Sequence, residues 1–273
     1  MFQKYTHHRW LALPHFLHLR RLPYWFLLST VLVLGAWIRL LWFGSLQSTL
    51  FEGHEANYLI YFEHLDTPNV GDTANYPAMQ WWWYLWGFVV PKTETAALLI
   101  SVCTGLASIL VLSESLRRLT QRTWPALMLG VLLCTHPLHV AWSTSIYNVM
   151  PPFFFIGLGI YFMVSPKRGG LLSLLSGICL GIAIGMRIEV GIVGLVFVGL
   201  CHHLAVPMRQ WIGFVLATVF MVFLLIVQTV MANEIPGSGE HELALSMNLG
   251  LDAYWAPYSG MVLLILLINA LLF

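Results

Sequence analysis

Long apolar runs are the feature that most constrains the fold of this chain. Several stretches of about 20 apolar residues follow one another, which is the length an α-helix needs to cross the hydrocarbon core of a bilayer. The runs are joined by short polar segments, and only 9% of all residues are charged, against about 25% in soluble domains. The alternating short strands of a membrane β-barrel are absent from the sequence. The sequence therefore predicts an all-α polytopic integral membrane protein.

Hydropathy divides the chain into about eight spans of this length. In chain order they are Pro23–Gly44, Thr95–Leu116, Trp124–Thr144, Val149–Val164, Gly170–Met186, Val190–Ala205, Trp211–Met231 and Tyr258–Phe273. The last run is cut by the end of the sequence, and one interpretation is a piece of a longer polypeptide. We expect a basic and aromatic surface segment (1–22), a first membrane module (23–205) with an outer loop (45–94), and two further spans (206–273) around a second outer loop (232–257).

The placement of Lys and Arg predicts the orientation of the spans. With the N-terminus inside, most of the 13 basic residues fall on the inner side: Lys4, Arg9, Arg20, Arg21, Arg117, Arg118, Arg122, Lys167, Arg168 and Arg209. Glu114 is the one acidic residue on that side. We therefore expect a cytoplasmic N-terminus. The expected location is a bacterial inner (plasma) membrane. The net charge of +1 gives no reason to expect a nucleic-acid partner.

The most concentrated polar segment lies just outside the first span. Residues 52–58 place Glu52, Glu55 and His54 on a short outer loop, ahead of a short helical pattern that carries Tyr58. Because the rest of the chain is so poor in charge, a cluster of charged and polar residues at this position indicates a function. Carboxylates at a membrane surface are suited to chemistry on lipid-linked substrates.

An aromatic segment closes the same loop. Tyr76 and Pro77 precede residues 81–86, whose sequence is Trp-Trp-Trp-Tyr-Leu-Trp. Trp and Tyr gather where a membrane meets water, so one interpretation is an interfacial anchor. The alternative is a platform on which a sugar or a prenyl chain stacks.

Two arginines lie at the predicted membrane edge. Arg39 occupies the outer half of the first span, where insertion scales assign an Arg a cost of about 2.5–3.5 kcal/mol. It could extend outward to the headgroups, or pair with an outer carboxylate or a lipid phosphate. Arg187 and Glu189 share a very short outer junction. They could form an ion pair that caps two helices, or Arg187 could present its guanidinium fork to a phosphate.

The sequence predicts neither a metal site nor a disulfide. His136 and His139 have a spacing that could ligate a metal, but no third ligand is evident. The cysteines all lie inside predicted spans, without C-x-x-C spacing: Cys103, Cys134, Cys179 and Cys201. Buried cysteine of this kind behaves as a small hydrophobic residue.

The order of these features resembles that of the GT-C glycosyltransferases. These are integral membrane enzymes that use polyprenyl-phosphate sugars, and they include relatives of protein mannosyltransferases and of lipid A aminoarabinose transferases. The matching elements are, in order, Arg39, residues 54–58, residues 76–81, Arg117-Arg118, Pro137 and Arg187-Ile188-Glu189. The resemblance covers residues 23–205 and implies juxtamembrane helices in the first outer loop.

The resemblance implies sugar transfer on the outer face by direct displacement at the anomeric carbon. Glu55 or Glu52 would accept the proton of the acceptor as general base. Arg187, with Glu189 beside it and with help from Arg39, would bind the leaving polyprenyl phosphate and stabilise its charge.

The same resemblance implies that His54, Tyr58 and Tyr76 line the sugar pocket. The implied partners are the polyprenyl-phosphate sugar, other membrane lipids and further membrane subunits. No cofactor is expected; a divalent metal is possible, but the sequence holds no ligand set that supports one.

Another interpretation is a catalytically inactive GT-C-like structural subunit of a larger membrane complex. His54 stands where the family usually has Asp, and Glu52 would have to substitute from two residues earlier. A transporter is a third class, but the halves show no convincing repeat and acidic residues inside the spans are nearly absent.

Overall fold

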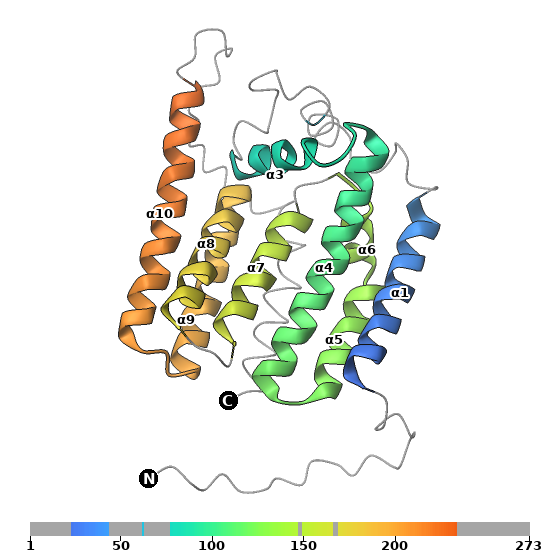
Figure 1. Ribbon diagram of the computed structural model, residues 1–273, viewed down its shortest axis with the longest axis horizontal. Helices are drawn as coiled ribbons and strands as arrows, with labels where there is room; N and C mark the ends of the chain where they lie inside the picture. The colour runs from blue at the N-terminus through green and yellow to red at the C-terminus, as the bar shows by residue number, and fades with distance from the viewer. Residues whose placement is uncertain (1–22, 44–61, 63–76, 147–148, 166–168, 234–273) are drawn as a thin grey trace, which may run out of the picture.

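The computed structural model describes residues 23–43, 62, 77–146, 149–165 and 169–233 (Figure 1). Its helices are α1 (Tyr24–Phe43), α3 (Pro77–Gly87), α4 (Glu94–Thr120), α5 (Thr123–Thr135), α6 (Pro137–Ser143), α7 (Met150–Met163), α8 (Gly170–Met186), the 3₁₀-helix η3 (Ile188–Val193), α9 (Gly194–His203) and α10 (Met208–Asn233). No strand occurs among these residues. The all-α prediction is confirmed for this part of the chain.

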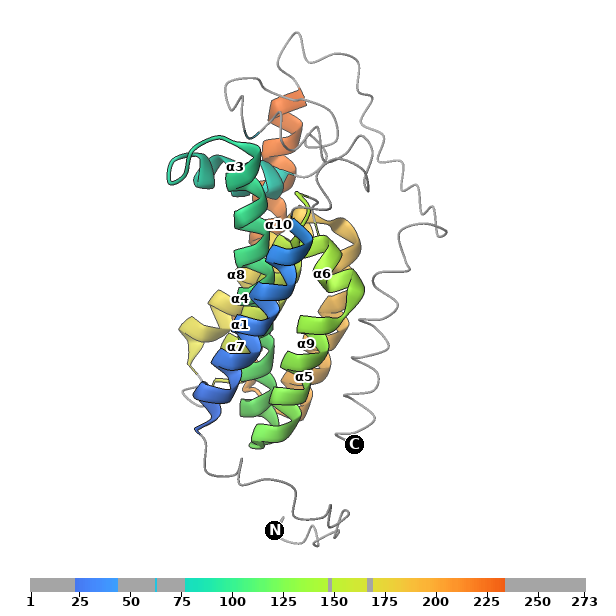
Figure 2. The ribbon, with the colours of Figure 1, turned by 90° about the vertical axis from the view of Figure 1, so that its right-hand side faces the viewer.

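The helices form an upright bundle with one helix lying across its end. Going along the chain, the upright helices run alternately up and down, and α3 lies across their upper ends (Figures 1 and 2). We call this end the α3 end. The opposite end, where α4 finishes and where α5 and α10 begin, is the basic end. It carries the described basic residues Arg117, Arg118, Arg122 and Arg209. The structure thus gathers on one end the residues that the sequence assigned to one side of the membrane.

Among the described residues, three helices are long and apolar enough to cross a membrane: α1, α4 and α10. The pair α5 and α6 makes a fourth candidate if the two are counted as one bent span. The helices α7 and α8 and the η3–α9 segment are apolar but shorter; α7, with 14 residues, is about 21 Å long against a hydrocarbon core of about 30 Å. The predicted span Tyr258–Phe273 lies outside the described residues. A total of eight spans remains a prediction.

The continuous helix predicted over Trp124–Thr144 is instead a bent pair. Its two parts, α5 and α6, meet at an angle of 64°. Proline disfavours helical geometry in the residue before it, and His136 has φ −65° and ψ 121°, outside the helical region. Pro137 then opens α6 at a position where its missing N–H costs nothing. The bend sets the direction in which the side chains of α6 project.

The outer faces of α1 and α10 are apolar and exposed. Large hydrophobic side chains cover them: Trp25, Phe26, Val33, Leu34, Trp37, Leu40 and Leu41 on α1, and Ile212, Leu216, Val219, Phe220, Phe223 and Leu224 on α10. A soluble monomer rarely exposes apolar patches of this extent, whereas a bilayer covers them. These faces support an integral membrane protein.

Helix α8 lies between α7 and α10 and is linked to both by hydroxyl groups. Ser176 Oγ donates to the carbonyl oxygen of Gly159 on α7 at 2.8 Å. On the other side, Thr218 Oγ1 of α10 donates to the carbonyl oxygen of Gly177 at 3.1 Å. Small residues and interhelical hydrogen bonds of this kind hold helices together in lipid, where the hydrophobic effect does not. The close packing fixes the end of α8, at which Arg187 lies.

Candidate functional site

The structure describes three of the site residues that the sequence singled out. Arg39 lies on α1, Arg187 directly follows α8, and Glu189 lies in η3. The other five fall outside the described residues: Glu52, His54, Glu55, Tyr58 and Tyr76. Their predicted roles in proton transfer and in the sugar pocket stay predictions.

Arg39 is completely buried where α1 meets α5 and α6. Its exposed fraction is 0%. One turn earlier, Gly35 lets α5 approach closely, because a Cβ at that position would lie 2.6 Å from Cys134 Sγ. The guanidinium then bonds to both helices: Nε donates to Ser143 Oγ of α6 at 2.7 Å, and Nη1 donates to the carbonyl oxygen of Gly35 in α1 itself at 2.9 Å. Arg39 therefore connects α1 to α6.

The same guanidinium fixes the proton positions on His139. Arg39 can only donate, so its Nη2, at 2.7 Å, must donate to His139 Nδ1. His139 then carries its proton on Nε2 and donates it to Ser108 Oγ at 3.2 Å. Ser108 Oγ in turn donates to the carbonyl oxygen of Gly105 at 2.7 Å. The result is a directional chain of hydrogen bonds from α1 through α6 to α4, with a neutral imidazole at its centre.

This arrangement bears on the interpretations offered for two residues. Of the two alternatives for Arg39, extension outward to the headgroups is wrong, because its side chain is fully buried in the bundle. Within the described residues its partners are hydroxyl, carbonyl and imidazole groups rather than a carboxylate. For His139, both ring nitrogens are engaged, so it offers no free ligand to a metal in this conformation.

Helix α3 packs against the upper end of α8 through an apolar cluster that we call the α3–α8 junction. Its fully or largely buried members on these helices are Ala78, Met79, Trp83 and Met186, and Trp82 packs against them. A Cβ on Gly185 would lie 3.3 Å from the Cβ of Ala78, so the two helices approach closely there. Arg187, two residues further on, is placed at the edge of this cluster.

Arg187 and Glu189 form a long ion pair at the α3 end. The chain leaves α8 in an extended conformation, with Arg187 at φ −155° and ψ 115°, and turns directly into η3. Arg187 Nε lies 3.6 Å from Glu189 Oε2, which is longer than a hydrogen bond. The Arg187 side chain is 3% exposed and that of Glu189 is 30% exposed. The structure thus brings these two predicted residues together, and it buries the cation more deeply than its carboxylate.

The α3–α8 junction also holds indole groups that lack acceptors. The Nε1 atoms of Trp82 and Trp83 are buried, and neither has a hydrogen-bond partner among the described residues. Buried polar groups are normally paired, so each such donor calls for an explanation. Two buried indole N–H donors within one apolar region can satisfy oxygen atoms of a bound group.

The tryptophan segment is therefore more than an interfacial belt. One side of α3 is buried, with Met79 at 0% and Trp83 at 1% exposure, while Trp81 and Leu85 on the other side are 48% and 58% exposed. Trp82 packs edge-on against Phe155 of α7. The exposed side fits the predicted anchor, and the buried side forms the roof of the junction.

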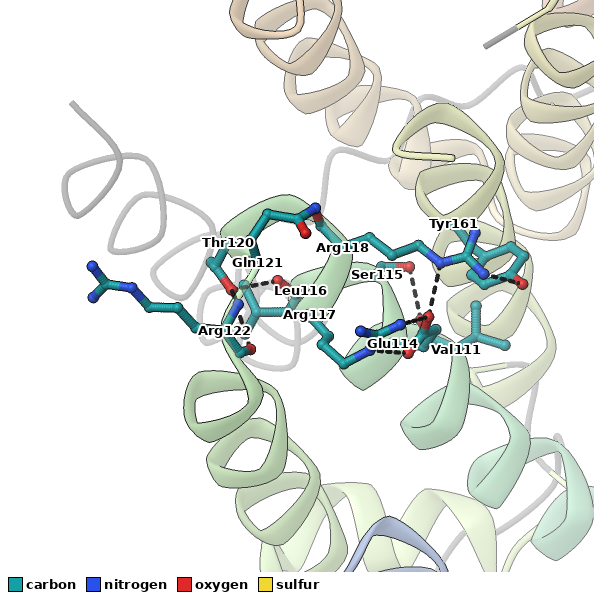
Figure 3. A network of polar contacts seen from close by, with 10 residues as sticks. All are labelled: Val111, Glu114, Ser115, Leu116, Arg117, Arg118, Thr120, Gln121, Arg122 and Tyr161. Carbon is teal, nitrogen blue, oxygen red and sulfur yellow. Dashed lines mark hydrogen bonds and ion pairs between the residues drawn. The ribbon is translucent and has the colours of Figure 1, made fainter. Parts of the chain in front are cut away.

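A second polar network, at the basic end, was not predicted. Glu114 is only 3% exposed, and its carboxylate accepts hydrogen bonds from both Arg117 and Arg118 at 2.7–2.8 Å (Figure 3). These arginines lie on the last turns of α4, not in a loop. The signal was present in the sequence, because Glu followed by Arg three and four residues later pairs on one face of a helix.

Comparisons with protein-family models, with curated proteins and with solved structures each found no match to this chain. The candidate sites therefore rest on their own geometry. The partners of Arg39 come from α1, α5 and α6, whereas Arg187 pairs with Glu189 beside α3. Arg39 and Arg187, which the resemblance placed in one phosphate site, belong to separate polar clusters.

Proposed function

We propose that this protein binds a polyprenyl-phosphate sugar at the α3 end and transfers the sugar to an acceptor there, as a GT-C-like membrane glycosyltransferase. The observation that carries the proposal is the α3–α8 junction. The junction holds the buried indole N–H groups of Trp82 and Trp83 in an apolar surround, and the buried Arg187 follows two residues after Gly185, where α8 approaches α3.

These groups suit a phosphate joined to an apolar chain. A guanidinium offers a planar fork of N–H donors to phosphate oxygens, and this interaction is strongest away from water. The indole donors can reach further phosphate or sugar oxygens. The apolar residues of the junction would contact the first isoprene units. In this proposal Arg187 stabilises the charge on the leaving phosphate, and Glu55 or Glu52 serves as the general base.

The proposal also includes the orientation of the protein. The described basic residues at the basic end would face the cytoplasm of a bacterial inner membrane, following the positive-inside rule. The α3 end, with the donor phosphate and the first outer loop, would then face outward. Accessibility of an engineered cysteine at Arg122 or at Lys92 to a membrane-impermeant thiol reagent tests this orientation directly.

Binding of the polyprenyl-phosphate substrate can be measured without knowing which molecule accepts the sugar, so it tests the proposal directly. We expect Arg187→Gln to lower the affinity of the purified protein for a long-chain polyprenyl phosphate about tenfold or more, the equivalent of one charge-assisted hydrogen bond. The measurement is a titration in neutral lipid nanodiscs, read by retention of labelled polyprenyl phosphate. Trp83→Phe, which removes the indole donor together with part of the buried ring, should weaken binding by a smaller factor.

Arg209→Gln is the matched control. Arg209 is an exposed arginine at the basic end, so its replacement removes the same charge at the end of the bundle opposite the junction. The affinity of the Arg209→Gln variant for the polyprenyl phosphate should equal that of the wild type. Equal affinities of Arg187→Gln and wild type, with both proteins folded, would refute the assignment of the phosphate site.

A GT-C-like structural subunit without activity is the second candidate, and Arg39 favours it. The resemblance places this arginine near the donor phosphate, yet here it is fully buried and bonded to the helices around it. Such a residue maintains the bundle and leaves the donor to Arg187 alone. Native mass spectrometry of the gently extracted protein separates the candidates. A polyprenyl-phosphate adduct supports the enzyme, while a fixed ratio to other subunits without that lipid supports the scaffold.

A further inference from the structure

The last turns of α4 hold more positive charge than the described residues neutralise. Arg117 and Arg118 share the single carboxylate of Glu114, and Arg122 follows in the turn to α5 (Figure 3). Three guanidinium groups and one carboxylate leave a net charge of +2. Within the described residues no ion pair is formed by Arg122, whose side chain points away from the network in Figure 3.

The two network arginines are held in place by aromatic rings. Arg118 Nη2 donates to Tyr161 Oη of α7 at 2.7 Å, and its guanidinium carbon lies 4.0 Å from the centre of that ring. The guanidinium carbon of Arg117 lies 5.1 Å from the centre of the Tyr24 ring on α1. Groups that are already positioned lose little conformational freedom when a ligand binds, so this network is prepared for one.

Several donors in the network have no acceptor in the described part of the chain. Glu114 receives bonds from Nε and Nη2 of Arg117 and from Nε of Arg118, which leaves Nη1 of both arginines without one. Tyr24 Oη is buried and also lacks a hydrogen-bond partner among these residues. Two guanidinium N–H groups and a hydroxyl close together are the complement of a phosphate group.

The depth of the network selects the source of that phosphate. It lies where α4 ends and α1 begins, and both helices are long enough to cross a membrane. The ends of such helices lie at the level of the lipid headgroups. The side chains of Arg117 and Arg118 are 36% and 22% exposed, so they are accessible from outside the bundle. Basic sites between helix ends are known to bind anionic headgroups.

We propose that Arg117, Arg118 and Tyr24, with Arg122 nearby, form a binding site for the phosphate of an anionic phospholipid headgroup. Glu114 and Tyr161 are positioning residues, which hold the guanidinium groups but leave their outer N–H groups free for the lipid. The exposed Trp25 and Phe26 on the first turn of α1 would contact the acyl chains of the same lipid. The site is independent of the proposed donor site, which lies at the opposite end of the bundle.

The test compares phosphatidylglycerol with phosphatidylcholine on the full chain. In nanodiscs of phosphatidylcholine with a rising fraction of phosphatidylglycerol, followed by native mass spectrometry, the wild type should retain phosphatidylglycerol. Arg117→Gln leaves Glu114 paired with Arg118 but removes one unit of charge, and we expect it to weaken retention about tenfold. Tyr24→Phe removes only the hydroxyl and should weaken it by a smaller factor.

Arg209→Gln again serves as the control, because it removes one positive charge from the same end but outside the network. The phosphatidylglycerol retention of this variant should match that of the wild type.

Glycerol phosphate, added in excess, distinguishes a lipid headgroup from a free phosphate as the ligand. Displacement of the lipid would mean that the site recognises a free phosphate equally well and would overturn the headgroup assignment. Equal retention of the two phospholipids by the wild type, or undiminished retention by Arg117→Gln, would also overturn the proposal. If Arg117→Gln does not fold, Tyr24→Phe decides by the same criterion.

Discussion

Replacing Arg39 with Ala is expected to lower the free energy of unfolding by about 2–4 kcal/mol, the sum expected for a cavity and a lost buried hydrogen-bond network. The variant removes a 0%-exposed side chain and leaves His139 Nδ1 without its donor. It also breaks the bond from α1 to Ser143 on α6. Unfolding by sodium dodecyl sulfate in mild detergent micelles, followed by far-UV circular dichroism, measures the loss.

Arg209→Ala is the control for this prediction. It removes an exposed arginine without network contacts, and its effect should stay within about 0.5 kcal/mol. Arg39→Met asks a different question, because methionine fills most of the space without donating. If the hydrogen bonds contribute net stability, Arg39→Met remains clearly less stable than wild type. Wild-type stability of Arg39→Met would show that removing the buried charge offsets the lost bonds, and would contradict our account.

A double-mutant cycle shows whether the two ends of the network act together. Arg39→Ala and His139→Ala share the Nη2–Nδ1 bond of 2.7 Å, so their combined effect should differ from the sum by about 0.5–3 kcal/mol. Additive effects would mean that each residue stabilises the bundle through packing alone.

The apolar runs in the sequence predicted most of the helices. The expected span Gly170–Met186 coincides with α8, and the expected Pro23–Gly44 differs from α1 by one residue at each end. These boundaries were readable because polar or extended residues, such as Arg187, interrupt the apolar run at a defined point. The bend before Pro137 was missed, since apolar residues resume in α6 and the two segments together have the length of one span.

The Arg39 network could not be predicted because its members are far apart in the chain. Arg39 and His139 are separated by 100 residues, and no local spacing rule pairs them. A weaker signal was present: Ser108, His139 and Ser143 are polar residues within apolar segments, where polar groups need partners. The sequence also named Arg187 and Glu189 as a local pair, and the structure brings them together. The indole donors of the α3–α8 junction depend on how α3 packs, which spacing alone does not give.

Gly177→Ala is expected to destabilise the bundle by about 1–3 kcal/mol through overpacking between α8 and α10. An added Cβ would lie 2.3 Å from the carbonyl oxygen of Phe214 and 3.0 Å from the Cβ of Ala217. A backbone oxygen cannot rotate away, so the two helices must separate. Separation would also stretch the hydrogen bond from Thr218 Oγ1 to the carbonyl oxygen of Gly177.

Gly199→Ala is the matched control, since it makes the same chemical change in α9. A Cβ on Gly199 would meet no atom within 4 Å, and alanine is the better helix former by about 1 kcal/mol. This variant should be as stable as the wild type or more stable. The same detergent unfolding experiment measures both variants, so their difference isolates the contact with α10 from helix propensity.

Gly185→Ala completes the comparison, because its clash is with a side chain that can move. The added Cβ would lie 2.1 Å from Leu225 Cδ1, at the end of a flexible side chain, although Ala78 Cβ at 3.3 Å limits the adjustment. We therefore expect Gly177→Ala to be the least stable of the three, Gly185→Ala intermediate and Gly199→Ala the most stable. If Gly177→Ala were as stable as Gly199→Ala, α8 and α10 would not approach each other as closely as described. The position of Arg187 at the end of α8 would then no longer be fixed by that packing, and the phosphate site proposed there would lose its structural support.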